Sequence, residues 1–220
     1  MNIILLFIET IITSIALIYL YKKEKYDGIY LWILLFTMFI GIISQKTTEI
    51  FGLEINLGFI TNALIFIASN ILIQKKGPEE SKKIISTIFI GNVIIFIFSI
   101  ISILFTSSTI NEITNTSFNK IFYLNNRIYV SSLISLIISI WINAKLYHQI
   151  RQIKNKIIIS NVLSTIIIHF IESILFCVLS YTFKLPIINI IELIVIRYVF
   201  KVTIGLIGTN IIYMINSFER

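Results

Sequence analysis

Apolar stretches of about 20 residues, almost free of charge, recur from one end of this chain to the other. A helix of that length crosses roughly 30 Å of hydrocarbon. A water-soluble domain is excluded, because 57% of the residues are hydrophobic and only 13% are charged. A transmembrane β-barrel is also excluded, because its strands alternate in polarity and run for only about 10 residues. The sequence therefore predicts an all-α, polytopic integral membrane helical bundle.

Hydropathy predicts seven transmembrane helices, with six as the alternative, in a single membrane domain that covers residues 1–220. The expected ranges are about 2–21, 29–46, 56–74, 84–106, 128–148, 157–183 and 188–216. The first range lacks a basic leader and a small-residue cleavage site, so we interpret it as a retained helix rather than a signal peptide. The third range is the most polar, and we expect it to be buried among the others.

Lysine and arginine are distributed unevenly between the predicted loops. The first, third and fifth loops carry Lys22, Lys23, Lys25, Lys75, Lys76, Lys82, Lys83, Arg151, Lys154 and Lys156, whereas the second, fourth and sixth carry only Lys46, Lys120, Arg127 and Lys184. The positive-inside rule then predicts an N-terminus outside and a C-terminus in the cytoplasm of a bacterial inner membrane. The longest loop, Ser107 to Asn126, lies outside, as a lid or a linker.

The same distribution accounts for the formal net charge of +7. Short, separated loops cannot form the continuous basic face that nucleic acid requires, so the expected surroundings are the lipid bilayer and no nucleic-acid partner is expected. The sequence also contains no metal-ligand spacing, no glycine-rich phosphate loop and no catalytic trio. The single cysteine, Cys177, has no partner for a disulfide. We therefore predict no enzyme, no cofactor and no metal.

Ionisable residues inside the predicted helices mark the candidate site, because a charge at the bilayer centre costs about 3 kcal/mol or more. His169 and Glu172 are three residues apart and share one helix face, with Ser173 adjacent. Arg197 and Lys201, four apart on the next helix, offer counter-charges. A purely structural salt bridge between these two helices is the alternative interpretation.

Other polar residues in the helices have simpler interpretations. Lys145, His148 and Glu192 lie near predicted membrane borders, where their charges can reach water, and we interpret them as structural. Glu9 is either a helix-contact residue or a site residue. A stripe of polar residues on the fifth predicted helix consists of Ser132, Ser135, Ser139 and Asn143. Packing explains the serines, whereas Asn143 requires a hydrogen-bond partner.

Six segments carry a resemblance to a known family through their order and spacing. They are Lys46 to Gly52, Phe66 to Leu72 continuing into Lys76 to Lys83, Arg127 to Leu133, Asn161 to Thr165, Tyr198 to Lys201, and Thr209 to Tyr213. Together they resemble the vitamin uptake transporter (VUT) family, whose characterised members are queuosine-precursor transporters. The resemblance covers nearly the whole chain and implies import of a small molecule, a 7-deazaguanine base or a related purine-like heterocycle.

The resemblance also implies roles for the polar residues. The ring N–H and exocyclic amine of a 7-deazaguanine are parallel donors, which the Glu172 carboxylate can accept together. Asn143, Asn161 and His169 are expected to read the other edge of the base. Other candidate substrate-binding residues are Ser173, Asn70 and two positions that retain the family residue, Arg127 and Lys201.

Several positions depart from the family pattern. Asn70 and Asn143 stand where the family has acids, and His169 and Glu172 replace Gln and Asp. Two alternatives therefore remain open at the level of sequence. One is a substrate-binding membrane subunit of an ATPase-energised vitamin uptake system, and the other is a diverged family member with a different substrate. A homo-oligomer is compatible with either.

Overall fold

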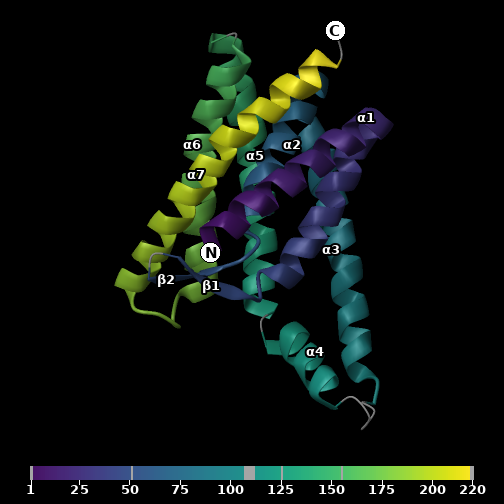
Figure 1. The fold of residues 1–220 in the computed structure, drawn as a ribbon, viewed down its shortest axis with the longest axis vertical. Coiled ribbons are helices and arrows are strands. Elements are labelled where there is room, and N and C mark those ends of the chain that lie inside the picture. The colour runs from purple at the N-terminus through teal and green to yellow at the C-terminus, as the bar shows by residue number, and fades with distance from the viewer. Residues whose placement is uncertain (1, 51, 107–111, 125, 155, 219–220) are drawn as a thin grey trace.

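The computed structural model describes residues 2–50, 52–106, 112–124, 126–154 and 156–218 (Figure 1). The elements are α1 (Asn2–Ile43), β1 (Thr47–Ile50), β2 (Leu53–Asn56), α2 (Phe59–Lys76), α3 (Glu80–Leu104), α4 (Glu112–Leu124), α5 (Asn126–Lys154), α6 (Ile157–Tyr181) and α7 (Ile187–Ser217). Among the described residues, four helices are long and apolar enough to cross a membrane: α1, α3, α5 from Arg127, and α6. The predicted all-α membrane class is confirmed.

Helix α1 contains two arms that the sequence predicted as separate helices. A straight helix of its 42 residues would measure about 63 Å, roughly twice the hydrocarbon thickness. The chain instead turns at Lys25, whose φ of 53° and ψ of −129° are not helical, and the two arms descend from that turn (Figure 1). A Cβ on Gly28 would lie 2.1 Å from the Leu20 oxygen, so only glycine allows the arms to approach this closely.

Helix α2 is the central element of the bundle. Every residue from Phe59 to Ile73 is buried, and the helix packs against α1, α3, α5, α6 and α7. This confirms the expectation that the most polar predicted helix lies among the others, where its side chains find partners instead of lipid. The predicted range began at about 56, but the helix begins at Phe59, because Leu53–Asn56 pairs with Thr47–Ile50 in an antiparallel hairpin.

The hairpin and α4 were not predicted from the sequence. Thr47 pairs with Asn56 and Ile50 with Leu53, and Gly52 in the turn has a φ of +79°, which favours glycine. Helix α4 occupies part of the expected loop 107–126 and extends beyond the bundle, next to the far end of α3 (Figure 1). Residues 107–111 and 125 of that expected loop lie outside the described residues.

The two ends of the bundle differ in charge. At one end, which we call the basic end, Lys83 lies 4.3 Å from the Tyr30 ring and Lys22 lies 4.3 Å from the Phe218 ring. The turn of α1, the start of α3 and the end of α7 therefore meet there. At the other end, which we call the hairpin end, the Asn2 amide donates to the Glu49 carbonyl oxygen at 2.9 Å. The basic loops thus gather in space as the charge alternation requires.

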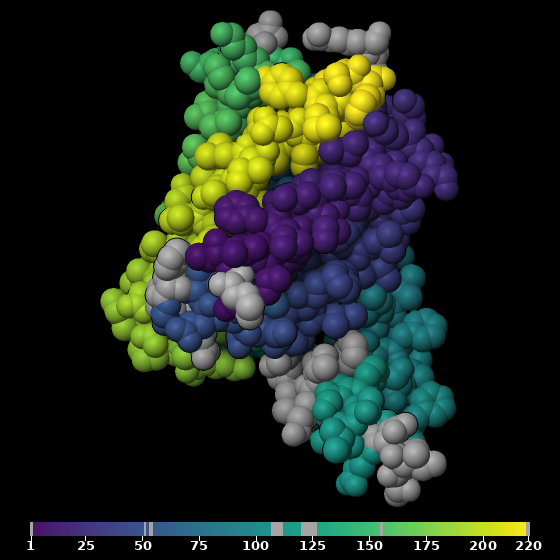
Figure 2. All heavy atoms as spheres, in the orientation of Figure 1, coloured from purple at the N-terminus to yellow at the C-terminus, as the bar shows by residue number. Residues whose placement is uncertain are grey.

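The outer surface is apolar, and polar side chains are buried within a largely apolar interior. Ile12, Phe98 and Val199 are more than half exposed on α1, α3 and α7. Figure 2 shows α1 and α7 side by side on one such face, with the hairpin below them. Several serines and asparagines, together with one histidine and one acid, are by contrast fully buried. An apolar surface with polar groups placed between the helices suits a lipid-embedded bundle.

Candidate functional site

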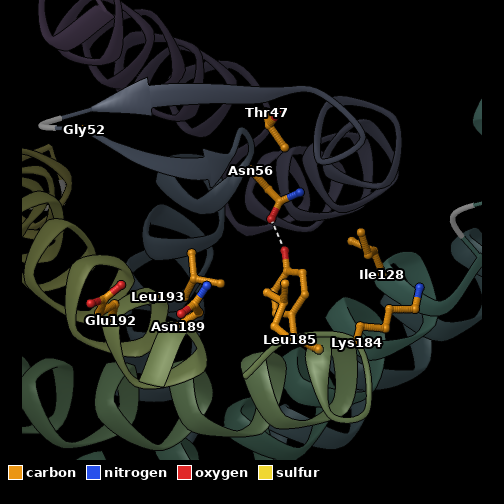
Figure 3. A pocket seen from close by; sticks show the side chains of 10 residues that line it. Thr47, Gly52, Asn56, Ile128, Lys184, Leu185, Asn189, Glu192 and Leu193 are labelled. Atoms are coloured by element: carbon orange, nitrogen blue, oxygen red, sulfur yellow. Dashed lines mark hydrogen bonds between the residues drawn. The ribbon is translucent and has the colours of Figure 1, made fainter. Parts of the chain in front are cut away.

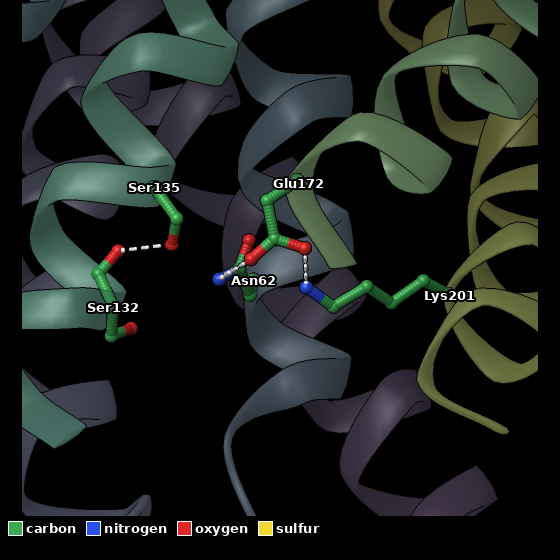
Figure 4. Close-up of polar contacts among 5 residues, drawn as sticks. All are labelled: Asn62, Ser132, Ser135, Glu172 and Lys201. Atoms are coloured by element: carbon green, nitrogen blue, oxygen red, sulfur yellow. Dashed lines mark hydrogen bonds and ion pairs between the residues drawn. The ribbon is translucent and has the colours of Figure 1, made fainter. Parts of the chain in front are cut away.

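The buried centre of the bundle holds an ion pair. The Lys201 ammonium of α7 donates to Glu172 Oε2 of α6, and both side chains are completely buried (Figure 4). Asn62 of α2 donates to the other carboxylate oxygen at 3.3 Å. In this view Ser132 and Ser135 of α5 lie on the side of Glu172 away from Lys201. Side chains of α2 and α7 therefore contact one carboxylate of α6.

Polar atoms without partners belong to residues close to Glu172 in the sequence of α6 and to Asn62, which contacts Glu172. Both ring nitrogens of His169, the Ser173 hydroxyl and Asn62 Oδ1 are buried and have no hydrogen-bond partner among the described residues. The His169 ring lies edge-on to Phe66, with 5.1 Å between ring centroids. Buried polar atoms are nearly always hydrogen-bonded in folded proteins, so this group of free donors and acceptors is the candidate place for a polar ligand.

Gly205 of α7 leaves room for His169 at this position. A Cβ on Gly205 would lie 2.5 Å from Thr165 Cγ2 and 3.3 Å from His169 Nε2. Because Gly205 lacks a Cβ, α7 packs directly against the polar face of α6. Lys201, one helical turn earlier on α7, is thereby brought to Glu172. A larger residue at position 205 would push the two helices apart at the level of the ion pair.

A second polar layer consists of three asparagines and a threonine from four helices. Asn143 donates to Asn70 Oδ1 at 2.7 Å, Asn70 donates to Asn161 Oδ1 at 2.8 Å, and Asn161 donates to Thr209 Oγ1 at 2.8 Å. Asn161 precedes Glu172 by 11 residues, or about 16 Å along α6 in the direction of the basic end. The sequence grouped these asparagines with Glu172, but the structure places them in a separate layer.

Arg127 lies apart from both layers. Its guanidinium donates to the carbonyl oxygens of Leu179 and Thr182, each at 2.8 Å, at the end of α6. These carbonyls belong to the last turn of the helix, where no intrahelical partner is available. In this structure Arg127 therefore caps α6 and does not contact Glu172.

Sequence reasoning missed two features of the site. Asn62 lies in the most polar predicted range, but no sequence pattern pairs it with Glu172. Their contact joins residues 110 positions apart. Arg197 was expected as a second counter-charge. Instead its guanidinium lies 3.8 Å from the Phe176 ring centroid, and its buried Nε has no hydrogen-bond partner among the described residues. The residues described here contain no group of His, Cys, Asp and Glu that could hold a metal ion.

A lipid-embedded helical bundle with charged and amide groups sealed in its centre defines a polytopic membrane protein with an interior polar site. A family model described as "Putative vitamin uptake transporter" matches residues 56–215, and the chain belongs to this transporter family. It is a multi-pass membrane protein.

A curated relative from Bacillus subtilis (strain 168), named "Probable queuosine precursor transporter", is 29% identical over 143 residues. The match covers 65% of this chain, and the chain spans 62% of the length of that relative. No solved structure matches the chain.

Proposed function

We propose that this protein imports a queuosine precursor, a 7-deazaguanine base or a related purine-like heterocycle, across the bacterial inner membrane. The family and the name of the Bacillus relative support transport of this kind. The observation that carries the proposal is the fully buried Glu172 carboxylate, which has unpaired polar atoms near it in the sequence of α6 and on α2. The orientation with the basic end in the cytoplasm follows from the positive-inside rule.

The carboxylate can hold a base without losing its lysine. A carboxylate offers about four lone-pair positions. Lys201 occupies one of them, and the Asn62 contact of 3.3 Å is long for a hydrogen bond. The ring N–H and exocyclic amine of a 7-deazaguanine replace Asn62 and donate together to Glu172. Lys201 meanwhile balances the buried charge.

The groups next to Glu172 provide the rest of the recognition. The unpaired nitrogens of His169 and the Ser173 hydroxyl offer hydrogen bonds to the carbonyl and the remaining ring nitrogen of the base. Phe66, already in contact with His169, supplies an aromatic surface. The asparagine layer lies on the cytoplasmic side of the carboxylate and, because its three amides bond to one another, it closes the path inward.

Transport in this proposal needs no nucleotide. Uptake is facilitated or driven by an ion gradient, and net accumulation follows from consumption of the base inside the cell. The proposal therefore predicts that the chain works without an ATPase subunit. Failure of uptake unless such a subunit is co-expressed would instead favour a substrate-binding subunit of an energised system.

The test is uptake in a bacterial host that lacks its own carrier and its precursor synthesis, with queuosine in tRNA as the readout. The wild-type chain is expected to restore the modification. Glu172→Gln is expected to lower the uptake rate roughly tenfold to a hundredfold, because a hydrogen bond to a charged group contributes about 1.5–3 kcal/mol.

Glu112→Gln is the matched control, because Glu112 is an exposed acid on α4. Full uptake by Glu172→Gln would contradict the role of the carboxylate. Absence of uptake by a wild-type protein that is shown to be in the membrane would contradict the substrate.

A further inference from the structure

An open pocket lies at the hairpin end of the bundle, between the hairpin and the connection from α6 to α7 (Figure 3). Its volume is about 500 Å³, within the range of small-molecule sites. Thr47 and Asn56 line it from the hairpin, and Lys184 and Leu185 line it from the opposite side (Figure 3). Nothing in the proposed function uses this pocket.

A hydrogen bond joins two of the residues that line the pocket. The Tyr181 hydroxyl at the end of α6 donates to Asn56 Oδ1 at the end of β2, and Figure 3 shows this bond at the pocket wall. Asn56 in turn donates to the Ser44 carbonyl oxygen at 3.0 Å. The bond therefore links the hairpin, the end of α1 and the end of α6, and these are the elements that must separate if a molecule is to pass inward.

Contacts continue from this bond to the buried carboxylate. The Tyr181 ring lies edge-on to Phe176, with 6.1 Å between centroids, and Phe176 lies against the Arg197 guanidinium. Phe176, Arg197 and Asn62 line a small cavity of about 10 Å³, and Asn62 donates to Glu172. A cavity of that size holds about one water molecule. The space next to Asn62 is therefore too small for a heterocycle unless side chains move.

Building on the proposed function, we propose that the open pocket is an entry site for a planar heterocycle with N–H donors, and that the Tyr181–Asn56 hydrogen bond is the gate between this site and Glu172. Asn189 and Glu192 line the pocket from one face of α7, three residues apart. The Glu192 carboxylate accepts from the donors of the base, as Glu172 does deeper in the bundle. The Tyr181 ring provides a stacking surface.

The entry site is tested by protection of an introduced thiol. Leu185→Cys, made together with Cys177→Ser, is labelled with a membrane-impermeant maleimide in intact cells. Saturating 7-deazaguanine is expected to slow labelling about threefold or more. Glu192→Gln is expected to raise the concentration that gives half-protection about tenfold, whereas the control Glu112→Gln leaves it unchanged. The same protection is expected with Glu172→Gln, because the two sites are separate.

The outcomes separate this proposal from the proposed function. Uptake by the wild type without protection overturns the entry site alone. Protection that disappears with Glu172→Gln also overturns it, because the thiol would then report the deep site. Protection without uptake supports the entry site and contradicts the transport proposal. Absence of both overturns both.

The gate is tested with the native cysteine. Cys177 lies one helical turn deeper than Tyr181 on α6 and is fully buried. Tyr181→Phe keeps the ring and removes the hydrogen bond, so labelling of Cys177 from outside is expected to increase about fivefold or more at an unchanged melting temperature. Asn56→Ala, which removes the acceptor, is expected to do the same. Tyr198→Phe on α7 is the control, and labelling of Cys177 that stays at the wild-type rate in both gate variants overturns the gate.

Discussion

Glu172 and Lys201 form a buried pair in which each charge compensates the other. Both side chains are completely shielded from solvent, so removal of one partner leaves an uncompensated charge in a medium of low dielectric. Removal of both partners leaves a neutral centre of similar volume, which is often as stable as the original pair. In the proposed function the pair serves what the carboxylate binds rather than the stability it adds.

A pair of variants tests this argument. Lys201→Met is expected to destabilise the protein by about 3–5 kcal/mol, because it leaves Glu172 buried and unpaired. Adding Glu172→Gln is expected to recover most of that loss while uptake stays low. The measurement is thermal unfolding of the purified protein in detergent, next to the uptake assay. A melting temperature that Lys201→Met leaves unchanged would contradict the dependence of the buried carboxylate on Lys201.

A substitution at Arg127 tests whether this residue stabilises the end of α6 or binds the substrate. Arg127→Gln removes the donors to the Leu179 and Thr182 carbonyls, so it is expected to lower stability by about 1–3 kcal/mol. The KM for the base should change little, since Arg127 does not contact Glu172 in this structure. Uptake kinetics and thermal unfolding test this expectation. A raised KM at unchanged stability would instead support a substrate-binding role for Arg127.

The packing of α7 against α2 depends on one small residue. A Cβ on Gly208 would lie 2.1 Å from Ile67 Cδ1 and 3.2 Å from Leu64 Cδ2, and both neighbours are fully buried on α2. Close approach through small residues is the usual means of helix association in membranes, where no hydrophobic effect drives it. Helix α7 can therefore lie this close to α2 because Gly208 has no Cβ.

Gly208→Leu is expected to separate α7 from α2 and to destabilise the protein by about 1–3 kcal/mol, the cost of overpacking a filled interior. Val199→Leu is the control, because Val199 lies on the exposed face of the same helix. Thermal unfolding measures both variants. Equal melting temperatures for the two variants would mean that α2 and α7 have room to move apart.

The elements that could be predicted from the sequence are those fixed by local hydropathy. The apolar runs that form α5, α6 and α7 are continuous, and their ends lie at charged or proline-containing segments. The hairpin could not be predicted, because its strands are only four residues each. The second strand, Leu53–Asn56, alternates apolar and polar residues, but the first, Thr47–Ile50, does not. Glu172 and Lys201 could be proposed as partners from helix spacing. The contact with Asn62 depends on how α2 is rotated within the bundle, which a local pattern does not determine.

At the scale of the whole molecule, the positions of the basic residues predict the orientation. Introduced cysteines test it in a Cys177→Ser background. Lys184→Cys, at the hairpin end, is expected to react with an impermeant maleimide in intact cells. Lys154→Cys and Ser217→Cys, at the basic end, are expected to react only in opened cells. Labelling of Ser217→Cys in intact cells would reverse the orientation and, with it, the proposed direction of transport.

The burial of α2 has a consequence for how the protein is made. Asn62, Asn70 and Gln74 make α2 a poor candidate for the translocation machinery to release into lipid by itself. Glu172, the partner of Asn62, is synthesised 110 residues later, when α6 emerges, at typical translation rates of about 5–20 residues per second. We therefore expect a half-made chain to keep α2 sheltered between the α1 arms and α3, and truncations before α7 to be degraded rather than assembled.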